Sequence, residues 1–313
     1  MLNRRHIRIK VMQTLYALHQ SNSDQLQTGE KFLNHSMDSI QELYLLMLTL
    51  LIEIRKKEED YIEISQKKHL ATYEERNPNK KFIDNQVLEL LSNSTSISNK
   101  VEERNMTYWQ RKDHYVQLVL DEIKASELYK NYMKAKTHSF EEDQAFIVDL
   151  YTDIIAPNEK LYDFVEDTKL TWVDDLPVVN TLIQKQLRQL KNAEQAFFVP
   201  KVFKDAEDKD FAMDLYRRTF LNGVELAKEY EGKTPNWDTE RIAAIDIVVM
   251  KMAICEMLRF SSIPVKVTIN EYLEVVKEYS TPKSSIFING ILDTISKELE
   301  AQGRLNKIGK GLL

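Results

Sequence analysis

The chain has 313 residues, 43% of them hydrophobic and 29% charged, which is enough for two cores or one extended helical core. Seven glycines and seven prolines are too few for the turns of an all-β or a nucleotide-binding α/β protein of this length. The formal net charge of -6 excludes a protein that coats nucleic acid with its whole surface, but it is compatible with a local basic site. The composition therefore favours an all-α protein.

The sequence predicts a reducing, cytoplasmic location. Cys255 is the single cysteine, so neither an intramolecular disulfide nor a cysteine-rich metal site can form. The first residues are basic but lead into no continuous apolar segment of the kind found in a signal peptide. The longest apolar run, 43–52, is much shorter than the roughly 18 to 20 residues that cross a bilayer, so we expect no membrane association.

Apolar residues recur at helical spacing along almost the whole chain. The first helix is predicted over 4–19, with Ile7, Val11, Leu15 and Leu18 on one buried stripe. Ser139 with Glu142, and Thr268 with Glu271, have the spacing of capping boxes and predict two helix starts. Polar composition predicts loops at 74–81 and 92–105. The further predicted helices cover 32–54, 108–136, 139–157, 158–167, 176–192, 208–230, 237–260, 268–279 and 283–302.

The chain contains an internal sequence similarity, here called the internal echo, between two segments 65 residues apart. Phe146, Leu150, Tyr151 and Trp172 match Phe211, Leu215, Tyr216 and Trp237, among other positions. Chance similarity between two amphipathic helices and a duplicated helical unit are both compatible with this match.

No motif with catalytic or cofactor chemistry is present. HExxH, CxxC, GxSxG and GxGxxG are all absent, and the six histidines are scattered. The spacing of glycines in the tail 303–311 does not fit a phosphate-binding loop. We therefore expect no enzyme, no metal and no cofactor.

The first helix begins with a concentration of basic residues. Arg4, Arg5, Arg8 and Lys10 give the first twenty residues a formal charge of +4, so the rest of the chain carries -10. At 100° per residue, Arg5, Arg8 and Tyr16 share one stripe beside the apolar one. Guanidinium groups bind phosphates and an aromatic ring can stack on an unpaired base, so this helix is a candidate site for single-stranded RNA.

Four segments resemble one known family, the NusB-type transcription antitermination factors. The start of the first helix is similar to that family's R-R-x-A-R and Q-x-L-Y. Three later blocks are similar to its I-D-x-x-I-L-R-x-A-x-x-E-L, V-P-x-x-V-A-I-N-E and S-x-K/R-F-V-N-G-V-L-D, and they keep the family's order and internal spacing. The segments are 4–16, 245–257, 263–271 and 285–293.

The resemblance implies an all-α fold of packed helical bundles, with an N-terminal part expanded by an extra helical region. It divides the chain into an N-terminal subdomain, 1–205, and a NusB-like C-terminal bundle, 206–313. Within the first, 1–20 is the RNA-binding helix and 24–205 an insertion that either braces this helix or docks a further partner. Gly290 lies inside a predicted helix, where we expect close backbone packing.

The resemblance also implies a function and a set of site residues. Such factors bind the boxA element of nascent RNA together with the ribosomal protein NusE, within the RNA polymerase antitermination complex that reads through terminators in ribosomal RNA operons. Matching positions make Asp246 and Lys251 candidates for the contact with NusE. The candidate RNA contacts are Arg4, Arg5, Arg8, Tyr16 and Lys283.

Two alternatives belong to other classes. A NusB-like domain also targets some ribosomal RNA cytosine methyltransferases, although no methyl-donor fold follows in this sequence. A helical protein-interaction scaffold without RNA binding is favoured by the acidic remainder, by Lys251 in place of the family's arginine, and by Ile286 at a usually basic position.

Overall fold

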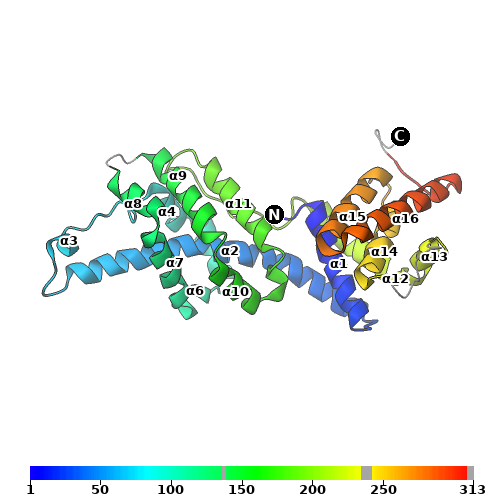
Figure 1. The fold of residues 1–313 in the computed structure, drawn as a ribbon, viewed down its shortest axis with the longest axis horizontal. Coiled ribbons are helices and arrows are strands. Elements are labelled where there is room, and N and C mark those ends of the chain that lie inside the picture. Colours follow the sequence, from blue (N-terminus) through cyan, green and yellow to red (C-terminus); the bar gives the residue numbers. More distant parts are fainter. Residues whose placement is uncertain (136–138, 234–241, 309–313) are drawn as a thin grey trace. The chain divides into compact units, whose positions relative to one another are not determined.

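The computed structural model describes residues 1–135, 139–233 and 242–308 (Figure 1). Within these ranges the chain forms sixteen α-helices, one π-helical turn, one 3₁₀ turn and no strand, which confirms the predicted all-α class. In the same residues, no helix is both long enough and apolar enough to span a membrane.

The helices form two compact units, and the first of these combines an N-terminal and a C-terminal segment of the chain. This terminal unit comprises Leu2–Met37 and Phe203–Leu313. Residues 2–37 therefore pack with the C-terminal third of the chain. The helices of the terminal unit are α1 (Arg4–Gln20), the first part of α2 (Leu26–Gln66), α12 (Ala206–Leu221), α13 (Gly223–Tyr230), α14 (Ala244–Arg259), α15 (Val265–Tyr279) and α16 (Pro282–Ala301).

The second unit, here called the central unit, comprises Asp38–Val202 together with Met1. Its longest element is the remainder of α2, whose fully buried leucines around Tyr44 form much of the core. The other helices of the central unit are α3 (Tyr73–Arg76), α4 (Gln86–Ser92), α5 (Thr95–Glu103), α6 (Tyr108–Arg111), α7 (Asp113–Ala125), α8 (Glu127–Lys134), α9 (Phe140–Leu150), the π-turn η1 (Tyr151–Ile155), α10 (Glu159–Thr168), the 3₁₀ turn η2 (Leu170–Trp172) and α11 (Leu176–Gln189).

Several local predictions agree with the structure. Helix α1 begins at Arg4, and its predicted apolar stripe is buried. Helix α9 follows a reciprocal capping box between Ser139 and Glu142, as their spacing predicts. The predicted helix 237–260 falls partly outside the described residues, and α14 is described from Ala244 onward.

Three local predictions are wrong. The segment 92–105 contains helix α5 rather than a continuous loop, because Ser94 caps it and Ile97 anchors it in the core. The predicted helix 108–136 is divided into α6, α7 and α8. The predicted helix 208–230 is interrupted at Asn222, which ends α12 with its side-chain amide donating to the carbonyl of Arg218.

The predicted capping box at Thr268 and Glu271 is also wrong. Helix α15 already begins at Val265, directly after Pro264, so Thr268 lies within its first turns. The buried stripe of this helix comprises Thr268, Tyr272, Val275 and Val276. Burial directs the Thr268 hydroxyl toward a carboxylate on α14 instead of toward a free backbone amide.

The internal echo maps onto α9 with η1 in the central unit and onto α12 in the terminal unit. The matched residues Phe146, Leu150 and Tyr151, and their counterparts in α12, are all buried. Residues 151–155 are π-helical, however, whereas the matching residues of α12 are α-helical. Trp237 lies outside the described residues, and a duplication stays a prediction.

Gly29 in α2 permits a close approach that no other residue allows. A Cβ atom at this position would collide with the hydroxyl of Tyr216, which is fully buried and donates to the carbonyl of Leu26. We expect Gly29→Ala to destabilise the chain by about 1–3 kcal/mol in urea unfolding, because the buried Tyr216 ring must shift to admit the methyl group.

Gly290→Ala is the matched control for this substitution. Contrary to the close packing expected from the sequence, a Cβ atom at Gly290 would meet no described atom within 4 Å. This variant should gain up to about 1 kcal/mol from helix propensity. Equal stabilities of the two variants would contradict the steric role of Gly29.

Candidate functional site

A capping box between Asn3 and His6 forms at the basic start of α1. The amide of His6 donates to the Asn3 side chain at 2.9 Å, and the Asn3 amide donates to Nδ1 of His6 at 3.4 Å. Burial lowers the pKa of His6, which favours the neutral ring whose Nδ1 can accept this bond. The first turn of α1 contains no acidic residue. The carboxylates that pair with its arginines, near the positive end of the helix dipole, therefore come from other helices.

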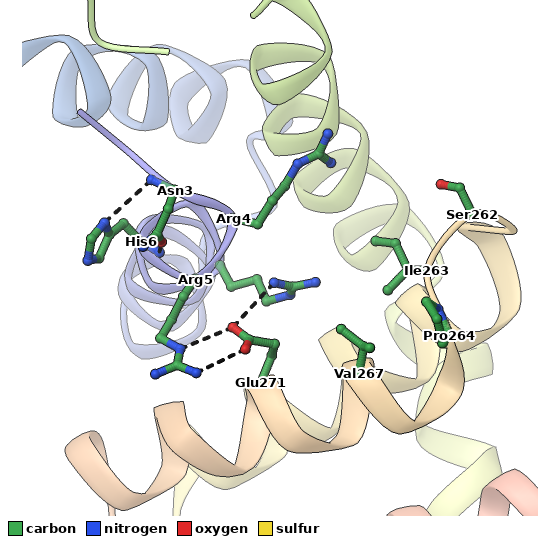
Figure 2. Close-up of a pocket in the computed structure, with 10 residues that line it drawn as sticks. Asn3, Arg4, Arg5, His6, Ser262, Ile263, Pro264, Val267 and Glu271 are labelled. Atoms are coloured by element: carbon green, nitrogen blue, oxygen red, sulfur yellow. Dashed lines mark hydrogen bonds and ion pairs between the residues drawn. The ribbon is translucent and has the colours of Figure 1, made fainter. Parts of the chain in front are cut away.

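Arg5 is held by a carboxylate on α15. Its Nε and Nη2 atoms donate to the two oxygens of Glu271 at 3.0 and 2.9 Å, in the bidentate geometry that guanidinium and carboxylate groups favour (Figure 2). These hydrogen bonds hold the pKa of Glu271 below its usual range and raise the pKa of Arg5. The Arg5 side chain is still 41% exposed.

Arg4 points toward α12, away from Glu271 (Figure 2). Its Nε lies 2.6 Å from Oδ1 of Asp208, and its guanidinium lies 4.3 Å from the centre of the Phe211 ring. The Arg4 side chain is 39% exposed, whereas that of Asp208 is 9% exposed. A buried carboxylate and an aromatic face therefore orient an accessible cation.

Arg8, by contrast, lies in the core of the terminal unit. Its side chain is 3% exposed and donates two 2.8 Å hydrogen bonds to Glu256 of α14, which is fully buried. The same carboxylate accepts hydrogen bonds from the hydroxyls of Thr268 and Tyr272 at 2.8 and 3.2 Å. Burial lowers the pKa of Arg8, but its hydrogen bonds to Glu256 and the nearby charges of Glu256, Tyr272 and Glu271 together raise it. Arg8 thus joins α1 to α14 and has little surface left for a ligand.

A cleft of about 680 Å³ lies beside these arginines, and we call it the arginine cleft. Ile263, Pro264 and Val267 form an apolar wall at the junction of α14 and α15, facing the start of α1 (Figure 2). Cations on one side and an apolar wall on the other suit a ligand with anionic and planar apolar parts. The complete lining is Asn3, Arg4, Arg5, His6, Arg8, Ser262, Ile263, Pro264, Val267 and Glu271.

The other two predicted RNA contacts do not line this cleft. Tyr16 lies three turns further along α1, is half-buried, and accepts a hydrogen bond from Gln20 at 2.6 Å. Lys283 is exposed in the first turn of α16, which the side chain of Thr281 caps.

The two predicted partner contacts lie on α14. Asp246 is buried, and its Oδ1 atom has no hydrogen-bond partner among the described residues. Lys251 is half-buried and lines a second cleft, of about 220 Å³, with Leu15, Leu18 and Val248. Burial lowers the pKa of Lys251.

Sequence reasoning missed the carboxylates that face the arginines. Glu256 lies inside the NusB-like segment 245–257, Glu271 is predicted to form a capping box, and Asp208 lies at the start of the predicted helix 208–230. The available signal was the uncompensated charge of the first helix. Because arginines on a packed helix need acidic partners, acids among apolar residues of other helices were candidates.

Comparison with known proteins assigns the family. Residues 176–297 match the sequence profile of the NusB family. The transcription antitermination protein NusB of Salinibacter ruber is 44% identical over 109 residues, which are 35% of this chain and 68% of that protein. The chain belongs to the NusB family.

Other NusB proteins show the same partial coverage. That of Koribacter versatilis is 34% identical over 36% of this chain and 76% of its own length. That of Chloroherpeton thalassium is 40% identical over 36% of this chain and 53% of its own length. A solved structure of T. maritima NusB has 31% identity over 37% of this chain and 83% of that chain, with a TM-score of 0.29. The family profile includes α14 and α15 but neither α1 nor most of the central unit.

Proposed function

We propose that this NusB-family chain is a transcription antitermination factor that binds boxA-like single-stranded RNA together with NusE in ribosomal RNA transcription. The observation that carries the proposal is the arginine cleft, which the partly exposed Arg4 and Arg5 line together with an apolar wall. Phosphates bind arginine forks, and an unpaired base or ribose packs on apolar groups. The relatives in Salinibacter ruber, Chloroherpeton thalassium and Koribacter versatilis are transcription antitermination proteins, which supports this assignment.

The proposal gives the five candidate RNA residues different roles. Arg4 and Arg5 contact phosphates, whereas buried Arg8 positions α1. Tyr16 and Lys283, which lie outside the cleft, extend the RNA path. Half-buried Lys251 on α14 contacts NusE within the RNA polymerase complex, whereas buried Asp246 has little surface left for a partner, and the factor acts in the cytoplasm. Because few phosphates are contacted, NusE is needed for tight binding.

The test is a fluorescence-anisotropy titration of a boxA-like RNA of about a dozen nucleotides, with and without NusE. We expect NusE to tighten binding and the Arg4→Ala, Arg5→Ala double variant to weaken it by roughly tenfold or more. Loss of two phosphate contacts should also reduce the slope of log K against log salt concentration by about 1.4. Both replaced side chains are partly exposed, so folding should be retained.

The Lys228→Ala, Lys297→Ala double variant serves as the control. It removes two positive charges from the terminal unit, as the arginine double variant does, but at positions outside the arginine cleft. Equal weakening by both double variants would contradict the assignment of the cleft. No salt-dependent RNA binding by the native chain, alone or with NusE, would favour the protein-interaction scaffold. That alternative has its own support, because each arginine of the cleft has an acidic partner.

A further inference from the structure

We infer that Glu271 sets the RNA affinity of the arginine cleft by competing with phosphate for Arg5, and that it shifts toward Arg8 when RNA binds. This inference rests on the proposed function. It makes Glu271 a specificity-determining residue that contacts no RNA itself.

The cleft lining holds three arginines and one carboxylate, that of Glu271, but each of these arginines is already paired with an acid. Its three arginines face four carboxylates, which belong to Asp208, Glu256, Glu271 and Glu274. A phosphate approaching this surface meets guanidinium groups whose charge is already compensated. Strong RNA binding therefore requires that at least one carboxylate leaves its arginine.

The geometry at Arg5 shows why the competition is direct. Glu271 occupies both Nε and Nη2, which form one of the two edges at which a guanidinium binds a phosphate bidentately, and Nη2 belongs to the other edge as well. Nη1 lies 3.9 Å from Glu274, which is hydrogen-bonded to Lys277 at 2.6 Å. RNA therefore reaches the Nε–Nη2 edge of Arg5 only by displacing Glu271.

Among the three carboxylates that lie within 3 Å of an arginine of the cleft, Glu271 is also the easiest to displace. Its side chain is 24% exposed, and Nη1 of Arg8 lies 3.7 Å from its Oε2 atom. When Arg5 leaves, Glu271 thus keeps a cation and some solvent. Asp208 and Glu256 are much more buried, and separating either from its arginine leaves a desolvated charge, which is strongly unfavourable.

A consequence for ligand choice follows from this arrangement. When a single phosphate binds Arg5, one ion pair forms and the Arg5–Glu271 pair is lost. The net gain in binding free energy is therefore small. A nucleic-acid strand also contacts the oriented Arg4 and the apolar wall in the same binding event. Competition by Glu271 therefore discriminates against isolated phosphates and in favour of an extended single strand.

The test is a double-mutant cycle on the full chain with the boxA-like RNA, which compares the native chain, Glu271→Gln, Arg5→Ala and the combined variant. Glu271→Gln should tighten RNA binding by about two- to fivefold, the range that a partly exposed ion pair accounts for. In the Arg5→Ala background the same substitution should change affinity by less than twofold, because no competition remains.

Glu274→Gln is the matched control, since it removes the same charge from the same helix without removing a hydrogen bond to Arg5. It should tighten binding less than Glu271→Gln does. Thermal unfolding by circular dichroism checks that the variants fold. If Glu271→Gln unfolds, Glu271→Asp replaces it in the cycle. This variant keeps the charge but has a shorter side chain that withdraws the carboxylate from Arg5, so it should also tighten binding.

The outcomes separate this inference from the proposed function. If the native chain binds RNA through Arg4 and Arg5 but Glu271→Gln binds equally or more weakly, only the competition is refuted. Equal tightening with and without Arg5 also overturns it, because it identifies a general charge effect. If neither the native chain nor Glu271→Gln binds RNA, the proposed function fails, and the inference fails with it.

Discussion

Replacing Arg8 with alanine should destabilise the chain by about 3–5 kcal/mol, because it leaves the carboxylate of Glu256 buried without its cation. Glu256 is fully buried, and the hydroxyls of Thr268 and Tyr272 are its other side-chain hydrogen-bond donors among the described residues. Urea unfolding followed by circular dichroism measures this loss. In thermal unfolding the midpoint should fall by roughly 10 °C.

Two further variants test the cause of this loss. Arg5→Ala removes a partly exposed arginine from the same helix and should cost less than about 1 kcal/mol. Arg8→Met combined with Glu256→Met removes both charges and should recover part of the stability lost in Arg8→Ala. A cost for Arg8→Ala similar to that for Arg5→Ala would contradict the structural role of the buried pair.

The Arg8 result also affects the interpretation of RNA binding. A loss of binding in Arg8→Ala is expected from the loosened packing of α1, even if no phosphate contacts Arg8. For this reason Arg4 and Arg5, whose side chains are partly exposed, are the informative positions in a binding assay.

Replacing Trp172 with alanine should cost about 3–5 kcal/mol of the stability of the central unit. The side chain is fully buried, and its Nε1 donates to the carbonyl of Ser39 on α2 at 3.0 Å. The Tyr108 ring lies edge-on, 5.9 Å away, and the ammonium of Lys169 lies 4.8 Å from the indole. Alanine leaves a cavity and removes all three interactions.

Controls for this prediction come from the same segment. Trp172→Phe keeps most of the ring packing and should retain a large part of the stability, although it removes the hydrogen bond to Ser39. Leu170→Ala changes a side chain that is 74% exposed and should stay within about 0.5 kcal/mol of the native chain in urea unfolding. Equal losses for Trp172→Ala and Leu170→Ala would show that Trp172 does not anchor this core.

Helix starts were predictable where the signal is local. The Ser139 box and the start of α1 depend on residues three or four positions apart. The same spacing at Thr268 was misleading, because the buried carboxylate of Glu256 binds the threonine hydroxyl inside a helix that began earlier. At 92–105, a single buried Ile97 outweighs the polar composition.

Four features are predictable from the sequence alone: the all-helical class, the buried stripe of α1, the concentration of basic residues at its start and the resemblance to the NusB family. All of these depend on periodicity, composition or short motifs. The accessibility of the arginines, by contrast, depends on tertiary packing. Arg8 and Glu256 are separated by 248 positions, and Arg5 and Glu271 by 266. The pairing of charges so distant in sequence depends on how α1, α14 and α15 pack, and burial then makes Arg8 structural while Arg4 and Arg5 stay exposed at the cleft.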